Sequence, residues 1–257
     1  MKLQAFIFNW PGEKQRAKDL EALLRPHCET FVINSDESAR DLHPQWHHLT
    51  SDAFFAAQWN KAVEIFSGDV LVHVQADAWP HDIERILDRC IYYIGERGVG
   101  VYAPNLDFTD LEYRRKALTA FDQEVYEVPS TDETCWMISS EVLRRMPLAE
   151  PEVNKYGWGM DFVASAVARS IGRKVVRDYR FHVDHPKGRG YNDSQARIKW
   201  VEYKQRLDPE LCKNIETLEK DVLRLMPGRF ERLKRRIRAI QMTAVTGRHR
   251  ATPPFKS

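Results

Sequence analysis

Two aspartates lie at positions where a carboxylate could bind a metal ion or accept a proton. Asp77 follows the apolar run 70–74 in the segment GDVLVHVQADAWP, and Asp161 follows a loop rich in glycine and tryptophan in the segment YGWGMDF. A carboxylate at the end of a buried strand can bind a divalent cation, and one at the start of a helix can accept a proton. Their order along the chain predicts a metal-assisted group-transfer site.

A histidine follows both aspartates. His185, in HPKGRGY, comes after the strand-like segment 181–183, and imidazole is an acceptable ligand for manganese. His182 is the rival ligand at this spacing, and a lone histidine is more often structural. Lys187 and Tyr191 lie on the same glycine-containing loop, where they either contact a diphosphate or remain solvated.

Apolar segments alternate with segments of helical periodicity along most of the chain. Strands are expected at 3–8, 30–33, 70–74, 98–103, 135–138 and 174–176. Helices are expected at 13–26, 51–66, 81–97, 140–146, 161–170, 211–225 and 230–240, with a polar connection at 105–131. This alternation predicts an α/β fold with a central, mainly parallel sheet. Ligands gather at the carboxyl ends of such strands, which is where Asp77 falls.

The order of these motifs resembles the family 2 glycosyltransferases of the GT-A fold, over roughly residues 1–190. Gln75-Ala76-Asp77 is similar to the D-x-D pair of that family, with Asp77 at the metal-binding acid and Gln75 in place of the first acid. The resemblance implies that Asp77 and His185 hold Mn²⁺ or Mg²⁺, which offsets the charge of the leaving diphosphate. Gln75 can hydrogen-bond the ribose of the donor or a metal-bound water, but because it brings no negative charge, weaker metal binding is expected. A structural aspartate that closes a turn is the alternative interpretation of Asp77.

The segment YGWGMDF resembles the G-W-G-x-(D/E) stretch of the same family. The resemblance implies that Asp161 is the catalytic base of an inverting displacement and that Trp158 and Gly159 face the acceptor. Asp132 lies where the family meets its acceptor. A helix-capping role after a glycine-rich loop is the alternative interpretation of Asp161.

Polar and aromatic residues also follow the first two predicted strands. By position, the resemblance implies that Phe8, Asn9 and Trp10, together with Ser35 and Asp36, bind the base and ribose of the donor.

The function expected from this resemblance is a hexosyltransferase-like enzyme. It would move a sugar from a nucleotide-sugar donor to a hydroxyl of a saccharide or lipid-linked acceptor, in cell-surface polysaccharide or glycolipid synthesis. One alternative is a transferase-like nucleotide-binding protein that is weakly active or inactive because of Gln75. Another is a nucleotidyltransferase, although Pro11-Gly12 makes a poor phosphate-binding loop.

Composition bounds the class of protein. The chain has 257 residues, of which 43% are hydrophobic and 30% charged, as in globular proteins. No apolar run reaches the ~20 residues of a membrane span, and the N-terminus reads as a strand, so a cytoplasmic location is expected. The four cysteines are scattered, which favours reduced thiols over a zinc site. We expect a transferase domain at 1–200 and a helical, basic extension at 201–257.

The C-terminal part is strongly basic. Residues 229–250 contain eight Arg and Lys residues and one Glu, whereas the whole chain has a net charge of +2. An apolar stripe in this segment consists of Phe230, Leu233, Ile237 and Ile240. Such a pattern suits either an anionic membrane surface bound through 229–242, with the protein peripheral on the inner face, or a helix packed on the main domain. A nucleic-acid partner is not expected, because the rest of the chain is acidic.

Overall fold

The computed structural model describes residues 1–107, 109, 111–185 and 193–227. The expected helix at 230–240 and the segment 229–242 lie outside the described residues, as do Lys187 and Tyr191.

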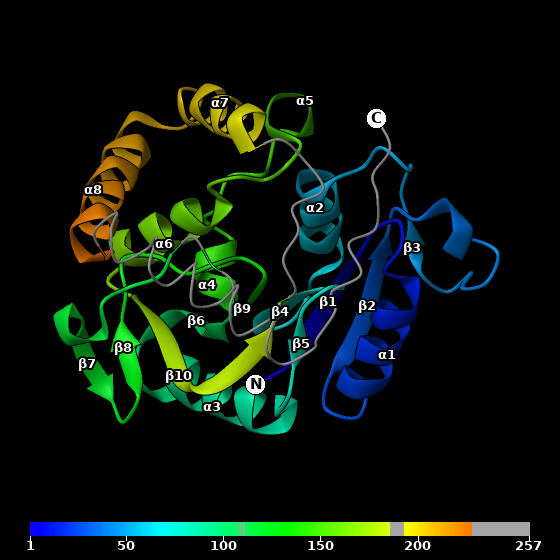
Figure 1. The fold of residues 1–257 in the computed structure, drawn as a ribbon, viewed down its shortest axis with the longest axis horizontal. Coiled ribbons are helices and arrows are strands. Elements are labelled where there is room, and N and C mark those ends of the chain that lie inside the picture. Colours follow the sequence, from blue (N-terminus) through cyan, green and yellow to red (C-terminus); the bar gives the residue numbers. More distant parts are fainter. Residues whose placement is uncertain (108, 110, 186–192, 228–257) are drawn as a thin grey trace, which may run out of the picture.

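A ten-stranded sheet forms the centre of the molecule (Figure 1). Its strands are β1 (Leu3–Asn9), β2 (Glu29–Asn34), β3 (His47–His48), β4 (Val70–Gln75), β5 (Trp79–Pro80), β6 (Val99–Leu106), β7 (Thr119–Asp122), β8 (Val125–Glu127), β9 (Cys135–Ser139) and β10 (Lys174–Asp184). The helices are α1 (Lys14–Leu24), α2 (Phe55–Ile65), α3 (Ile83–Glu96), α4 (Ser140–Leu143), α5 (Pro151–Asn154), α6 (Met160–Ser170), α7 (Asp193–Lys204) and α8 (Pro209–Leu225), with short 3₁₀ turns at Glu37–Ala39 and Arg115–Ala117.

The sheet is mixed, with a mostly parallel centre. The strand order is β3-β2-β1-β4-β9-β6-β10-β8-β7, and β5 pairs with β10. β1 pairs in parallel with β2 and with β4, and β2 pairs in parallel with β3. β6 and β10 also pair in parallel. β9 runs antiparallel between β4 and β6, so its first residues lie at the edge where the neighbouring strands end. The predicted α/β class with a mainly parallel sheet is therefore confirmed.

Side chains of the central strands are buried on both faces of the sheet, because helices cover both. On β1, Phe6 and Phe8 point into a core shared with α2, α4, α6 and α8. Ala5 and Ile7 point the other way, into a core shared with α1 and α3. This is the two-residue period of a strand, and it accounts for the continuous apolar run that the sequence shows in each central strand.

Helices α7 and α8 lie on the α6 side of the sheet (Figure 1). Trp200 on α7 and Ile215, Leu218 and Val222 on α8 are buried in the core that contains Phe6 and Phe8. The predicted division at residue 200 falls within α7. That residues 201–257 act as a separate extension stays a prediction.

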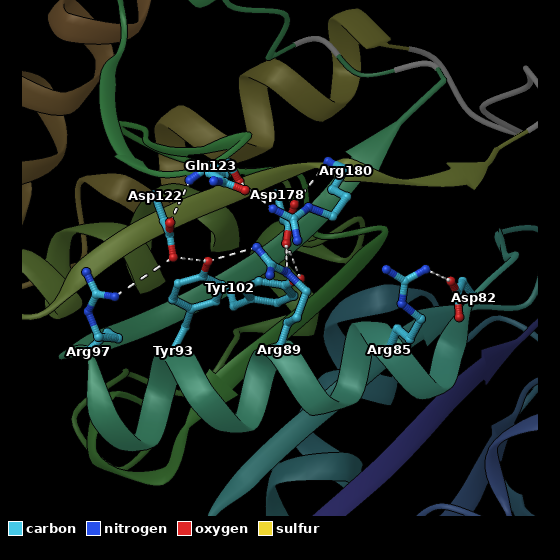
Figure 2. Close-up of polar contacts among 10 residues, drawn as sticks. All are labelled: Asp82, Arg85, Arg89, Tyr93, Arg97, Tyr102, Asp122, Gln123, Asp178 and Arg180. Carbon is cyan, nitrogen blue, oxygen red and sulfur yellow. Dashed lines mark hydrogen bonds and ion pairs between the residues drawn. The ribbon is translucent and has the colours of Figure 1, made fainter.

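Strand β10 is longer than the expected 174–176 segment, and its middle contains the buried charged residues Arg177 and Asp178. Asp178 is fully buried and accepts hydrogen bonds from Arg89 on α3, from the Tyr102 hydroxyl at 3.0 Å and from the backbone N–H of Arg180 at 3.0 Å (Figure 2). A carboxylate with this many donors can be buried without a large desolvation cost. The network therefore ties α3 to β10 and is structural.

Candidate functional site

Polar residues from five segments gather at one edge of the sheet. Since β1, β2, β4, β6 and β10 run in the same direction, their carboxyl ends share this edge. Asn9, Asn34, Gln75 and Asp184 are the last residues of their strands, and Thr134 immediately precedes the antiparallel β9. The backbone N–H of Gln75 donates to the carbonyl of Thr134 at 2.9 Å. The edge predicted from the sequence as the ligand-binding side is thus rich in polar groups.

Asp77 and His185 lie side by side, although they are far apart in the chain. The Nε2 atom of His185 is 3.4 Å from Oδ2 of Asp77, and the two side chains are 17% and 12% exposed. The pairing of Trp79 on β5 with Asp184 on β10 brings the two segments together. The N–H of Ala78 donates a hydrogen bond to the carbonyl of Gln75 at 2.9 Å. This turn holds Asp77 at the end of the strand.

The second carboxylate oxygen of Asp77 lacks a partner in the part of the chain that the structure describes. Oδ1 is buried and accepts no hydrogen bond there. A buried carboxylate oxygen without a donor is costly, and a cation satisfies it. Together with the adjacent imidazole, this donor set fits a divalent ion such as Mn²⁺.

Two residues near Asp77 were not predicted from the sequence. Arg16 Nη1 donates to the backbone carbonyl of Asp77 at 3.2 Å and lies 3.8 Å from Oε2 of Glu13. The pKa of Glu13 is raised, chiefly by burial and also by the charge of Asp77, while Arg16 lowers it. Both residues lie at the start of α1, directly after the β1 turn, and that position next to a strand end is the one signal that could have found them. They place one more carboxylate and one cation next to Asp77.

His182, the rival ligand, contacts a different group of residues. Its Nε2 atom is 2.6 Å from Oδ1 of Asp107 and 3.5 Å from Oδ1 of Asp184. The hydrogen bond to Asp107 raises the pKa of His182. Asp107, Asp184 and His81 were not predicted as site residues from the sequence, because none of them stands in a recognisable motif.

The glycines before Asp161 are needed for packing. Gly157 has φ +71 and Gly159 has φ +85, a region that L side chains rarely adopt. A Cβ at Gly157 would overlap the ring of Phe55, and one at Gly159 would overlap the ring of Trp200. Two aromatic rings of the protein itself therefore occupy the space beside these glycines.

Asp161 lies within the first turn of α6, and the residue that precedes the helix is Gly159. Asp161 is thus not the capping residue that the alternative interpretation expected, although its charge is still favoured by the helix dipole. Its backbone carbonyl accepts from the Ser165 hydroxyl at 2.7 Å, and the same hydroxyl lies 3.1 Å from that of Ser130. This contact places the start of α6 beside the segment that leads to Asp132.

Asp132 shapes the turn before β9. Its Oδ1 accepts from the backbone N–H of Thr134 at 2.9 Å and from the Thr134 hydroxyl at 2.6 Å. Trp158 is half-buried, with the Arg197 guanidinium over its ring, 5.6 Å from the centroid. Its backbone carbonyl accepts from Asn154 at 2.8 Å. Through Ser165, the first turn of α6 that carries Asp161 thus lies near Ser130, two residues before Asp132.

The residues proposed to bind the donor fall into two groups. Phe8 is fully buried, and its ring packs against Phe55 and His73, so its side chain is not accessible to a ligand. Trp10 is half-buried at the rim of the same core.

The other donor candidates form a buried hydrogen-bonded network. Asn9 Nδ2 donates to Asn34 Oδ1 at 2.6 Å, and the backbone carbonyl of Asn9 accepts from the N–H of Ser35 at 3.0 Å. Asp36 Oδ1 accepts from the N–H of Ser38 at 2.9 Å. Ser35 is 1% and Asp36 5% exposed, so these side chains build the floor of the edge.

Comparisons with known proteins identify the fold. No protein-family model matches the sequence, and no curated protein matches it. Among solved structures, GalNAc-T7 with UDP, GalNAc and Mn²⁺ is similar over 84% of this chain and 55% of that chain, with a TM-score of 0.54 and 13% identity. Residues 1–349 of S. aureus TarS in complex with UDP-GlcNAc are similar over 83% of this chain and 69% of that chain, with a TM-score of 0.52 and 12% identity. A further structure of S. aureus TarS is similar over 89% of this chain and 50% of that chain, with a TM-score of 0.53 and 12% identity. The predicted GT-A-like fold is therefore confirmed.

No helix in the described part of the chain has the length and apolar character needed to cross a bilayer.

Proposed function

We propose that this chain, built on a GT-A-like fold, is a metal-dependent inverting glycosyltransferase that moves a sugar from a nucleotide-sugar donor to a hydroxyl acceptor. The observation that carries the proposal is the contact between Asp77 and His185 at the carboxyl edge of the sheet, with a buried oxygen of Asp77 left without a donor among the described residues. The similar structures of GalNAc-T7 and TarS hold UDP and UDP-GlcNAc, which makes uridine nucleotides the first donors to test.

Asp77 and His185 hold Mn²⁺ or Mg²⁺ in this proposal. The bound ion supplies charge that offsets the negative charge developing on the leaving diphosphate. Glu13 adds a second negative charge close to Asp77, where the D-x-D resemblance lacks one at Gln75. The guanidinium of Arg16, whose side chain is 43% exposed, provides a positive charge that binds the phosphates of the donor in this proposal.

Asp161 is the proton acceptor in this proposal. A hydroxyl group that attacks the sugar must lose its proton, and a carboxylate within hydrogen-bond reach accelerates that step. A direct in-line attack inverts the configuration at the anomeric carbon. In this proposal Asp132 and Trp158 contact the acceptor, a saccharide or a lipid-linked saccharide, while Gly159, packed against Trp200, fixes the position of Asp161.

The nucleotide is proposed to rest on the ends of β1 and β2. Asn9, Ser35 and Asp36 form the floor, and Trp10 offers a partly exposed ring. Phe8 supports this floor from inside the core. In this proposal Gln75, partly exposed at the end of β4, hydrogen-bonds the ribose. Lys187 and Tyr191 are proposed to contact the diphosphate.

A donor-turnover assay tests the function. The full chain is incubated with a panel of nucleotide sugars, with Mn²⁺ or with a chelator, and released nucleoside diphosphate is measured with and without saccharide acceptors. Metal-dependent release of diphosphate supports the transferase. Tight nucleotide binding without turnover on any donor identifies the inactive, nucleotide-binding alternative. Pyrophosphate release from a nucleoside triphosphate and a sugar phosphate identifies a nucleotidyltransferase.

A cytoplasmic location, peripheral on the inner face of the membrane, completes the proposal. It rests on the basic and apolar pattern of residues 229–242, because basic residues near an anionic surface contribute ~1 kcal/mol each. Flotation with anionic and neutral vesicles compares the full chain with a version that ends at Gly228. Equal behaviour of the two proteins would remove the membrane role of this segment.

A further inference from the structure

A cluster of metal-binding side chains lies outside the Asp77 site. Asp107, His182 and Asp184 each offer one ligand atom, and these atoms all lie within 4.8 Å of one another. The His182 Nε2 atom is 2.6 Å from Asp107 Oδ1 and 3.5 Å from Asp184 Oδ1. Ligands about 2.1 Å from a tetrahedral zinc ion lie ~3.4 Å apart, so small side-chain shifts would fit these atoms around one ion.

The backbone holds the three residues in place before any ion binds. His182 and Asp184 are on β10 and point to one face, while Val183 between them is fully buried on the other. Asp107 directly follows β6, which pairs with β10 up to Leu106 and Val183, and its N–H donates to the Val183 carbonyl at 3.3 Å. A preformed set of ligands binds a metal more tightly because less ordering is needed.

A fourth residue supports the cluster. His81, next to β5, has its Nε2 atom 2.8 Å from Oδ2 of Asp184, the oxygen that does not face His182. Such a partner orients a ligating carboxylate. Three neighbouring segments, at β5, β6 and β10, thus contribute to one group of two imidazoles and two carboxylates.

We propose that Asp107, His182 and Asp184 form a second binding site for a divalent transition metal, with His81 as the residue that orients Asp184. One imidazole and two carboxylates suit Zn²⁺, Co²⁺ or Mn²⁺, whereas Mg²⁺ prefers oxygen ligands and water. The side chains of the three ligands are 33–44% exposed, so an ion can enter from solvent and keep a bound water. The bound ion joins the ends of β6 and β10, immediately before His185, and stabilises the folded chain.

Zinc binding to the full chain tests the site independently of the proposed transferase activity. Calorimetry is carried out in the Asp77→Asn background, which removes the other candidate site. We expect this protein to bind one equivalent of Zn²⁺ and to unfold at a higher temperature with Zn²⁺ than without it. Adding His182→Gln should weaken Zn²⁺ binding at least ~100-fold, since loss of a supporting partner alone costs ~10–100-fold. His81→Gln should fall within that smaller range.

Two further variants complete the test. Asp107→Asn replaces a charged ligand oxygen by a neutral one of the same shape, and it should also weaken Zn²⁺ binding. His27→Gln alters an exposed histidine elsewhere and should change nothing. The proposal is overturned if the Asp77→Asn protein binds no Zn²⁺, or if His182→Gln and Asp107→Asn leave its Zn²⁺ affinity and thermal shift unchanged. Neither result bears on Asp77, so failure here leaves the transferase proposal standing.

Discussion

Trp200 of α7 packs directly against the backbone of Gly159, two positions before Asp161. A Cβ at Gly159 would lie under 3.0 Å from three atoms of the Trp200 ring. Trp200 is buried in the same core as Met160 and Val163 of α6. Helix α7 therefore fixes where α6 begins and, with it, the position of Asp161.

Replacing Gly159 tests this relationship. Gly159→Ala should destabilise the protein by ~2–5 kcal/mol, because backbone strain in the left-handed region adds to overpacking against Trp200. Gly172→Ala is the matched control, since Gly172 has φ +74 with nothing within 4 Å of a Cβ. It should cost only the backbone strain, ~1–2 kcal/mol. Urea denaturation measures both.

A double-mutant cycle with Trp200→Ala separates the two contributions. If the overlap with Trp200 matters, Gly159→Ala should cost at least ~1 kcal/mol less in the Trp200→Ala background. Additive free energies of unfolding would show that Trp200 does not constrain Gly159.

Asp161→Asn should leave donor binding intact and lower transfer by ~10²–10⁴-fold. The amide has nearly the same shape as the carboxylate but cannot accept the proton of the attacking hydroxyl. Transfer rates and donor affinity are measured on the same protein preparation. Transfer within a few-fold of the wild type would mean that Asp161 only supports the start of α6.

Glu13→Gln should weaken Mn²⁺ binding while donor specificity stays unchanged. The substitution removes the Glu13 carboxylate, whose pKa is raised by burial and by the charge of Asp77. The site should then attract a cation less strongly. Titration of Mn²⁺ by electron paramagnetic resonance gives the affinity. An unchanged Mn²⁺ affinity would exclude Glu13 from the electrostatics of the site.

The buried His73 makes the free energy of unfolding depend on pH. It is fully buried among Phe8, Phe55 and Trp59, and burial lowers its pKa from 6.5 to about 3. The unfolded chain therefore binds a proton that the folded chain excludes, so this stability is present above about pH 6.5 and is lost as the pH falls toward 3. From pH 7 to pH 5 the loss from this group is about 2 kcal/mol.

His73→Phe keeps the ring and removes the titration. The variant should lose less stability between pH 7 and pH 5 than the wild type, and the difference should be near that 2 kcal/mol. Urea denaturation at the two pH values measures it, with the exposed His27→Gln as the control. Parallel pH profiles for wild type and His73→Phe would contradict the lowered pKa.

The central strands were predictable from the sequence because they are buried on both faces. The run 70–74 was expected as a strand and is β4, Val70–Gln75, so that Asp77 falls at the strand end as predicted. The hairpin of β7 and β8 was missed within the expected polar connection. β7 is an edge strand whose residues, Thr119–Asp122, are mostly exposed and show no apolar period.

Contacts distant in sequence explain the other missed features. Helix α7 was not predicted because only Ala196, Trp200 and Tyr203 face inward, among many charged residues. The full length of β10 was missed because its middle is charged, and Asp178 there is buried through a partner, Arg89, that lies on α3. In the candidate site, Arg16 stands in no local motif and reaches the Asp77 carbonyl only through the fold.

The central claim is that Asp77 and His185 hold the cation through which a nucleoside diphosphate is bound. Calorimetry of UDP and other nucleoside diphosphates, with and without Mn²⁺, tests it on the wild type, Asp77→Asn, His185→Gln and the exposed α3 control Asp88→Asn. We expect Mn²⁺-dependent binding in the wild type and in Asp88→Asn. In the two site variants nucleotide binding should be weaker by ~10-fold or more. Nucleotide binding that is indifferent both to Mn²⁺ and to the loss of Asp77 would contradict the claim.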